Sequence, residues 1–132
     1  MKRLLLVLSL VALSGCAAIE TVIKQVPSFN DPNQSSSIVR VQVLADNIDC
    51  LQPQYPQAQA LQLELQYFIV YSQNAGIRHH DVIDLVTPLK ETVDDWATRT
   101  KTGSGSMMYC SIKKGIIQED AHRAAKVVLG RF

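Results

Sequence analysis

The chain has 132 residues, and 47% of them are hydrophobic. Its 13 lysines and arginines against 12 aspartates and glutamates give a formal net charge of +1. This balance excludes the class of proteins that bind nucleic acids through a large net positive charge. The length allows one small domain with a modest hydrophobic core.

The first fifteen residues have the three parts of an export signal. Lys2 and Arg3 form a positive end, and residues 4–13 form an apolar run that is interrupted only by Ser9. A run of this length is too short to span a hydrocarbon core of about 30 Å. It ends in the sequence Leu13-Ser14-Gly15-Cys16. This segment resembles the signal peptide and lipobox of bacterial lipoproteins.

The resemblance implies cleavage before Cys16, with lipid attached to its sulfur and to the new amino group. Three acyl chains anchor a protein stably to a bilayer, whereas one chain binds only marginally. The residue after the cysteine is Ala17, not the aspartate that retains such proteins in the inner membrane. In a Gram-negative host the resemblance therefore implies the periplasmic face of the outer membrane. The alternative is an ordinary cleaved signal peptide with a chance cysteine.

Residues 16–37 are predicted to contain the lipidated cysteine, a short amphipathic segment and a linker. Ile19, Val22, Ile23 and Val26 share one helical face, and Glu20 and Lys24 lie opposite. Two turns are marginal alone, so this stripe needs a surface, and both the bilayer and the domain body are candidates. The run from Pro27 to Ser37 is typical of a polar, flexible linker.

Cys50 and Cys110 are the cysteines that remain after Cys16. An even pair in an exported domain predicts a disulfide. The chain-entropy model gives closure of so large a loop a stabilisation of about 4 kcal/mol. Two unpaired buried thiols are the alternative. A metal site is disfavoured because neither cysteine has another cysteine or a histidine within four residues.

The helical domain is predicted to begin near Ile38, after a cap at Ser36 or Ser37. Val41 begins a helical stripe that continues through Leu51, although the β-branched residues 38–43 also fit a strand. We favour the helix. The apolar residues expected to share its buried face are Val41, Leu44, Ile48 and Leu51.

Three further helical patterns follow. Residues 57–74 form the strongest, with a core stripe of Leu61, Leu65, Phe68 and Ile69 that is widened by Leu63, Tyr67, Val70 and Tyr71. Residues 81–98 are interrupted at Thr87-Pro88, which indicates either a new helix or a kinked one, with Leu89, Val93 and Trp96 facing inward. Residues 107–129 form the last, with a seam of Cys110, Ile117, Ala121, Ala124 and Val128, broadened by Ile112 and Ile116. The fold class predicted is all-α, a bundle of four or five helices with one disulfide on a lipid-anchored tether.

No catalytic constellation is evident. In Arg78-His79-His80-Asp81 the adjacent histidines would point about 100° apart on a helix, so they cannot easily hold one metal ion. His122 could join them only through tertiary structure. The glycine- and serine-rich residues 102–106 lack the ending of a phosphate-binding loop. We therefore expect no enzyme activity, metal or cofactor.

The last third of the chain is basic, and its cations are either a solvated helix face or a binding patch. We expect a non-catalytic adaptor or scaffold whose partners are the bilayer, through Cys16, and an envelope protein. The alternative is a protective inhibitor, such as an immunity or phage-exclusion lipoprotein, that blocks an incoming toxin or injection apparatus. The expected contact uses the basic residues of the last helix: Lys113, Lys114, Arg123 and Lys126.

Overall fold

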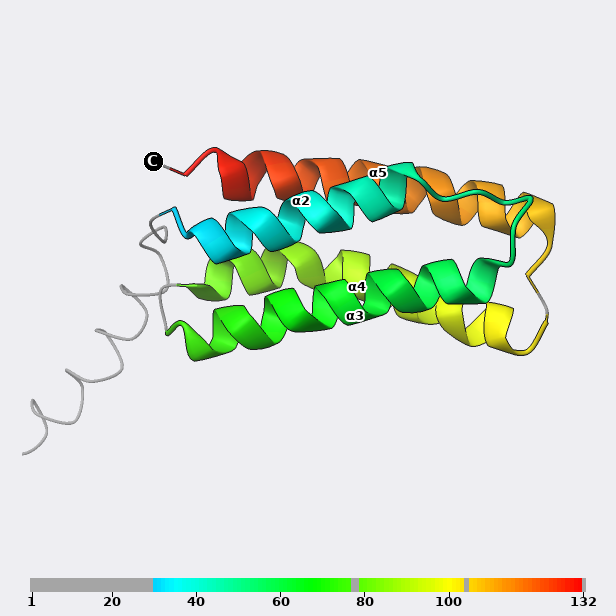
Figure 1. Cartoon of the computed structure of the whole chain (residues 1–132), viewed down its shortest axis with the longest axis horizontal. Coiled ribbons are helices and arrows are strands. Elements are labelled where there is room, and N and C mark those ends of the chain that lie inside the picture. Colours follow the sequence, from blue (N-terminus) through cyan, green and yellow to red (C-terminus); the bar gives the residue numbers. More distant parts are fainter. Residues whose placement is uncertain (1–29, 77–78, 104, 132) are drawn as a thin grey trace, which may run out of the picture.

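In the part of the chain that the structure describes, four antiparallel helices lie side by side in an elongated bundle (Figure 1). The computed structural model describes residues 30–76, 79–103 and 105–131. The helices are α2 (Pro32–Asp46), α3 (Gln54–Asn74), α4 (His80–Lys101) and α5 (Met107–Leu129). The predicted all-α class is confirmed for this part of the chain. The signal peptide, Cys16 and the amphipathic segment 19–26 lie outside it.

Each helix packs against two neighbours, in the order α2, α3, α4, α5 and back to α2. This ring is the packing expected of an up-down-up-down bundle with short connections. The loops 47–53 and 102–106 lie at one end of the bundle, and the start of α2 and the C-terminus lie at the other (Figure 1).

The first helix of the bundle begins earlier than the sequence analysis predicted. The side chain of Asp31 accepts hydrogen bonds from the backbone N–H groups of Asn33 and Gln34 over 2.8 and 3.2 Å. Aspartate is a favoured N-cap, and proline is favoured next because its missing N–H has no helical partner at that position. This pair starts α2 at Pro32.

The prediction of a linker is therefore wrong for residues 32–37. The predicted cap at Ser36 or Ser37 is wrong as well, because both residues lie within α2. The buried Ser37 donates its hydroxyl hydrogen to Glu64 Oε1 on α3 over 2.7 Å. The helix continues through residues 38–43, which confirms helix over strand at these positions.

The prolines have different effects on α3 and α4. Pro53 immediately precedes α3, whereas Pro88 lies inside α4 without ending it. α3 starts at Gln54, and Pro56 lies in its first turn, where a missing N–H costs no helical hydrogen bond. α4 passes through Pro88 as one helix, so no separate helix begins there. Asp84 and Pro88 are both exposed, so solvent can satisfy the carbonyl that proline leaves without a donor.

The last helix runs over the predicted residues. Ser106 caps α5, and its hydroxyl accepts a hydrogen bond from the backbone N–H of Tyr109 over 3.1 Å. The predicted seam is buried, which confirms the helical period used to predict it.

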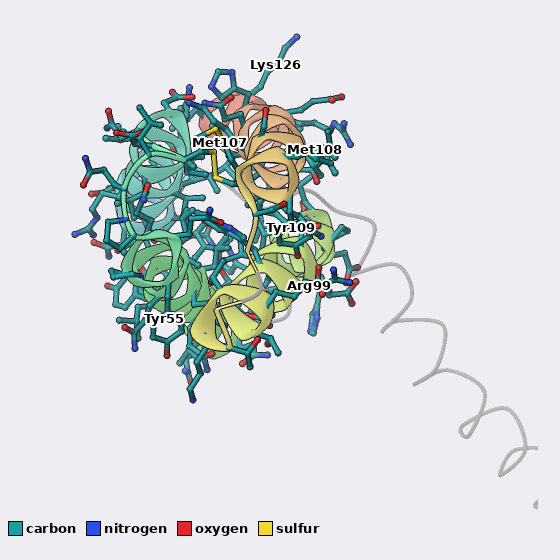
Figure 2. All side chains as sticks on the ribbon, turned by 90° about the vertical axis from the view of Figure 1, so that its right-hand side faces the viewer. Tyr55, Arg99, Met107, Met108, Tyr109 and Lys126 are labelled. Atoms are coloured by element: carbon teal, nitrogen blue, oxygen red, sulfur yellow. A yellow bond between two sulfur atoms is a disulfide. The ribbon has the colours of Figure 1, made fainter. Side chains whose placement is uncertain are left out.

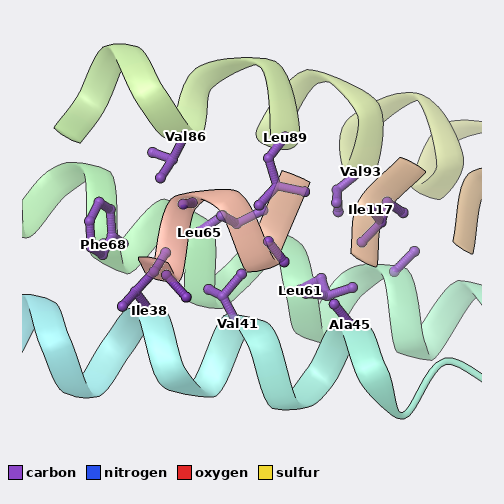
Figure 3. Close-up of a cluster of buried hydrophobic side chains, with 14 of the residues drawn as sticks. Ile38, Val41, Ala45, Leu61, Leu65, Phe68, Val86, Leu89, Val93 and Ile117 are labelled. Carbon is purple, nitrogen blue, oxygen red and sulfur yellow. The ribbon is translucent and has the colours of Figure 1, made fainter. Parts of the chain in front are cut away.

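The core contains side chains from all four helices, as Figure 3 shows for Ile38, Leu65, Leu89 and Ile117. Trp96 is also fully buried, and its indole N–H donates to Gln54 Oε1 over 3.2 Å. The predicted inward residues of α4 are confirmed, namely Leu89, Val93 and Trp96.

Several apolar residues predicted to form or to widen the buried faces are exposed instead. Leu51 is 78% exposed in the loop that follows α2. On α3 and α5 the residues that break the prediction are Leu63, Tyr67, Val70, Ile112 and Ile116. A helix in a ring of four has only two neighbours, so its outer side remains in solvent whatever residues it carries.

Candidate protein-binding surface

The basic residues expected to bind a partner do not form one surface. Lys113 is half-buried beside α4, where its ammonium lies 2.8 Å from Asp95 Oδ2. Lys114 lies beside α2 and donates to the backbone carbonyl of Ile48 over 2.7 Å. These consecutive lysines connect α5 to two different parts of the bundle, Lys113 to α4 and Lys114 to the loop after α2. Both ammonium groups therefore make contacts within the domain.

The two remaining basic positions lie farther along α5. Arg123 forms ion pairs with Glu119 at 2.9 Å and with Asp120 at 3.5 Å, both on its own helix. Lys126 is exposed near the last turn (Figure 2). The concentrated cationic surface expected from the sequence is therefore divided and partly neutralised.

A charged cluster joins the end of α4 to the start of α5 around Tyr109 (Figure 2). Tyr109 donates its hydroxyl hydrogen to Asp95 Oδ2 over 2.8 Å, and the Arg99 guanidinium lies 5.0 Å from the centre of the tyrosine ring. The hydrogen bond from Lys113, followed by that from Tyr109, lowers the pKa of Asp95. Burial, followed by the bond to Asp95, raises the pKa of Tyr109 to about 12. Such a cluster stabilises the α4–α5 contact.

The cysteines form the predicted disulfide. The Sγ atoms of Cys50 and Cys110 are bonded, and their Cα atoms are 5.7 Å apart, within the usual range for a disulfide. The bond joins the loop after α2 to the first turn of α5. It leaves no free thiol among the described residues.

The three histidines have different contacts. His79 Nδ1 lies 2.9 Å from Nε2 of the buried Gln34, which also donates to Ser72 Oγ. His80 is exposed, and His122 Nε2 lies 2.8 Å from Asp46 Oδ1. Across residues 30–76, 79–103 and 105–131, no three histidine, cysteine, aspartate or glutamate side chains lie together as a metal site would require.

A polar hollow of about 310 Å³ lies at the end of the bundle that carries loops 47–53 and 102–106. No carboxylate, imidazole, amine or thiol is found among the described residues that line it. Its lining residues are Gln52, Pro53, Gln54, Tyr55, Thr100, Gly103 and Gly105.

A shallow apolar groove lies on the outer side of α3. Leu63 is 67% exposed, Tyr67 is 50% exposed and Val70 is 43% exposed. These residues follow each other at intervals of four and three, the spacing of a seam that receives another helix. The groove has a volume of about 480 Å³ and is lined by Leu63, Gln66, Tyr67, Val70, Tyr71 and Asn74.

The exposed side of α3 is also free of charge. The only ionisable carboxylate within Gln54–Asn74 is that of Glu64, which is turned to α2, where it accepts from Ser37 and lies 3.3 Å from Arg40. The exposed residues are Pro56, Gln59, Leu63, Gln66, Tyr67, Val70, Gln73 and Asn74. Apolar and aromatic residues without charges are typical of the centre of a protein interface.

The C-terminal end of this groove is fixed by the start of α2. Tyr71 donates to the Asp31 carboxylate, with Oδ1 and Oδ2 at 3.2 and 3.0 Å, and accepts from Asn33 Nδ2 over 3.0 Å. These contacts hold one wall of the groove in place. The sequence analysis missed this surface because it assigned the α3 aromatics to the core. The signal that could have found it is the run of glutamines in α3, among which Glu64 is the single charged residue.

No described helix combines the length and apolar character needed to cross a membrane. Comparison with known proteins gave no match: no protein family, no curated protein and no solved structure matches this chain.

Proposed function

We propose that this protein is a lipoprotein anchored through Cys16 to the periplasmic face of the outer membrane, where it acts as a non-catalytic adaptor. The support for the anchor is the signal and lipobox sequence that ends at Cys16. The support for binding is the uncharged apolar face of α3. That face is the single observation that carries the proposal.

A contiguous apolar face that is exposed to water lowers the solubility of a protein, and such faces are typical of sites that bind a partner. The spacing of Leu63, Tyr67 and Val70 favours a helix that inserts its own apolar residues between them. Because the rim consists of amides, the partner helix should carry polar, uncharged residues at the edge of its contact. The partner is thus an envelope protein with an amphipathic helix, and the α3 face replaces the α5 cations as its proposed contact.

Photo-crosslinking in intact cells tests the binding surface. A photoreactive amino acid at Leu63 should give a discrete adduct with one envelope protein, and Tyr67→Glu should abolish that adduct. The matched control is the same probe at Val127, an exposed apolar residue of α5. Equal adducts from both positions would show that the α3 face has no special role.

Metabolic labelling with palmitate tests the anchor separately. The natural protein should incorporate label, and Cys16→Ser should not, because the acceptor sulfur is absent. Label in the Cys16→Ser protein would contradict the anchor without bearing on the α3 face.

A further inference from the structure

The chain enters the bundle beside the apolar groove of α3. Asp31 is held by the Tyr71 hydroxyl, with Oδ2 at 3.0 Å, and Tyr71 lines the groove together with Asn74. The residue before it, Asn30, accepts a hydrogen bond from Ser35 Oγ over 2.9 Å. Asn30 and Asp31, which lead into α2, therefore lie at the C-terminal end of the groove.

The sequence just before this point carries an apolar stripe of matching size. Residues 27–30 separate Val26 from Asp31, and four residues span at most about 13 Å. The eight residues 19–26 would measure about 12 Å as a helix, and the groove from Leu63 to Asn74 measures about 16 Å along α3. A connection of this length is usual between two antiparallel helices.

We propose that residues 19–26 dock in the α3 groove as a strap. Ile19, Val22, Ile23 and Val26 face the groove, with Val26 nearest its Asn74 end. The strap runs parallel to α3, and residues 27–31 then reverse the chain into α2.

The distribution of charge on the strap and on the groove agrees with this docking. The opposite face of the strap carries Glu20 and Lys24, which remain in solvent and need no counter-charge from an uncharged groove. The covalent connection also gives the strap a local concentration on the order of millimolar, far above that of a free partner.

The proposal rests on the proposed function in one respect, because the strap covers the face that the partner binds. Only Ala17 and Ala18 separate the strap from Cys16. Docking thus holds the bundle against the membrane, and displacement by a partner helix releases it. The strap competes with the partner for Leu63, Tyr67 and Val70.

An intramolecular crosslink tests the strap with the mature, acylated protein in phospholipid nanodiscs and no partner. A benzophenone side chain in place of Tyr67 should yield adducts that mass spectrometry maps to residues 19–26 of the same chain. Val22→Asp should reduce their yield about tenfold, because it introduces a carboxylate at an apolar contact. Lys24→Asp, on the opposite face, is the matched control and should leave the yield unchanged.

Three results would overturn the proposal: adducts with lipid alone, adducts between isotopically distinct copies, or a yield that Val22→Asp does not change. Unchanged circular dichroism and an intact disulfide on a non-reducing gel would show that each variant has folded. The test is independent of the proposed function, because a partner adduct at Leu63 in cells could persist when the intramolecular adduct is absent, and the reverse.

Discussion

The Tyr109 hydroxyl on α5 donates a hydrogen bond of 2.8 Å to Asp95 Oδ2 on α4. Lys113 shares the same oxygen at 2.8 Å. One carboxylate therefore receives two donors from the next helix and fixes the position of the first turns of α5 relative to the last turns of α4. Protonation of Asp95 at acid pH and deprotonation of Tyr109 at alkaline pH both change this contact.

At alkaline pH we expect the helix contact to weaken as Tyr109 ionises. Its pKa of about 12 in the folded state lies above the value of about 10 for an unfolded tyrosine. The stabilisation is therefore complete below pH 10 and is lost as the pH rises through about 12. Absorbance at 295 nm during titration should show one tyrosine ionising late, and Tyr109→Phe should remove that step. A late step that survives Tyr109→Phe would contradict the assignment.

At acid pH we expect the Asp95 contribution to disappear. Its folded pKa is lowered, chiefly by the hydrogen bond from Lys113, so its stabilisation exists above the unfolded pKa of about 4 and fades as the pH falls through the folded value. Asp95→Asn should flatten this part of the stability curve in urea denaturation at successive pH values. Asp84→Asn, at an exposed position on the same helix, serves as the control and should preserve the curve.

Removal of the disulfide should destabilise the bundle without changing its helices. The bond closes a loop with a sequence separation of 60, for which chain entropy gives about 4 kcal/mol. Cys50→Ala with Cys110→Ala should therefore lower the melting temperature by more than about 10 °C, because each kcal/mol is equivalent to about 4–8 °C in a domain of this size. Thermal unfolding followed by circular dichroism measures the effect. A melting temperature that is unchanged would mean that the bond adds nothing to stability.

Two leucines on one helix test the assignment of its faces. Leu65 is fully buried, so Leu65→Ala should cost about 2–5 kcal/mol of unfolding free energy. Leu63 is mostly exposed, so Leu63→Ala should change it by no more than about 0.5 kcal/mol. Urea denaturation of both variants provides the comparison. Similar losses would indicate that Leu63 belongs to the core, as the sequence analysis had predicted.

The fold class and several helix boundaries could be predicted because local chemistry determines them. Ser106 caps α5 and Gly130 follows it, so the boundaries at Met107 and Leu129 follow from residues next to them. Asp31 and Pro32 are a start signal of the same kind. The four serines and two prolines of residues 27–37 also fit a linker, and this composition obscured the start of α2.

The candidate site could not be predicted in the same way. Helical periodicity places Leu63 and Tyr67 on a common apolar face with their neighbours, but it does not give the number of helices that cover that face. The ring arrangement leaves the outer side of α3 uncovered, and this is a property of the whole bundle. Likewise, the contacts of Lys113 and Lys114 depend on which helices flank α5.

Gly105 lies against Gln54, the residue that accepts the hydrogen bond of the Trp96 indole. A Cβ atom at this position would lie 2.9 Å from Gln54 Oε1 and 2.8 Å from Thr100 Cγ2, so a larger residue must displace both side chains. Gln54 Oε1 accepts the indole hydrogen of Trp96, the single tryptophan of the chain. Any movement of loop 102–106 that disturbs Gln54 therefore alters the surroundings of the only indole. We therefore expect the fluorescence of Trp96 to report changes at the α4–α5 connection in the natural protein, without an added label.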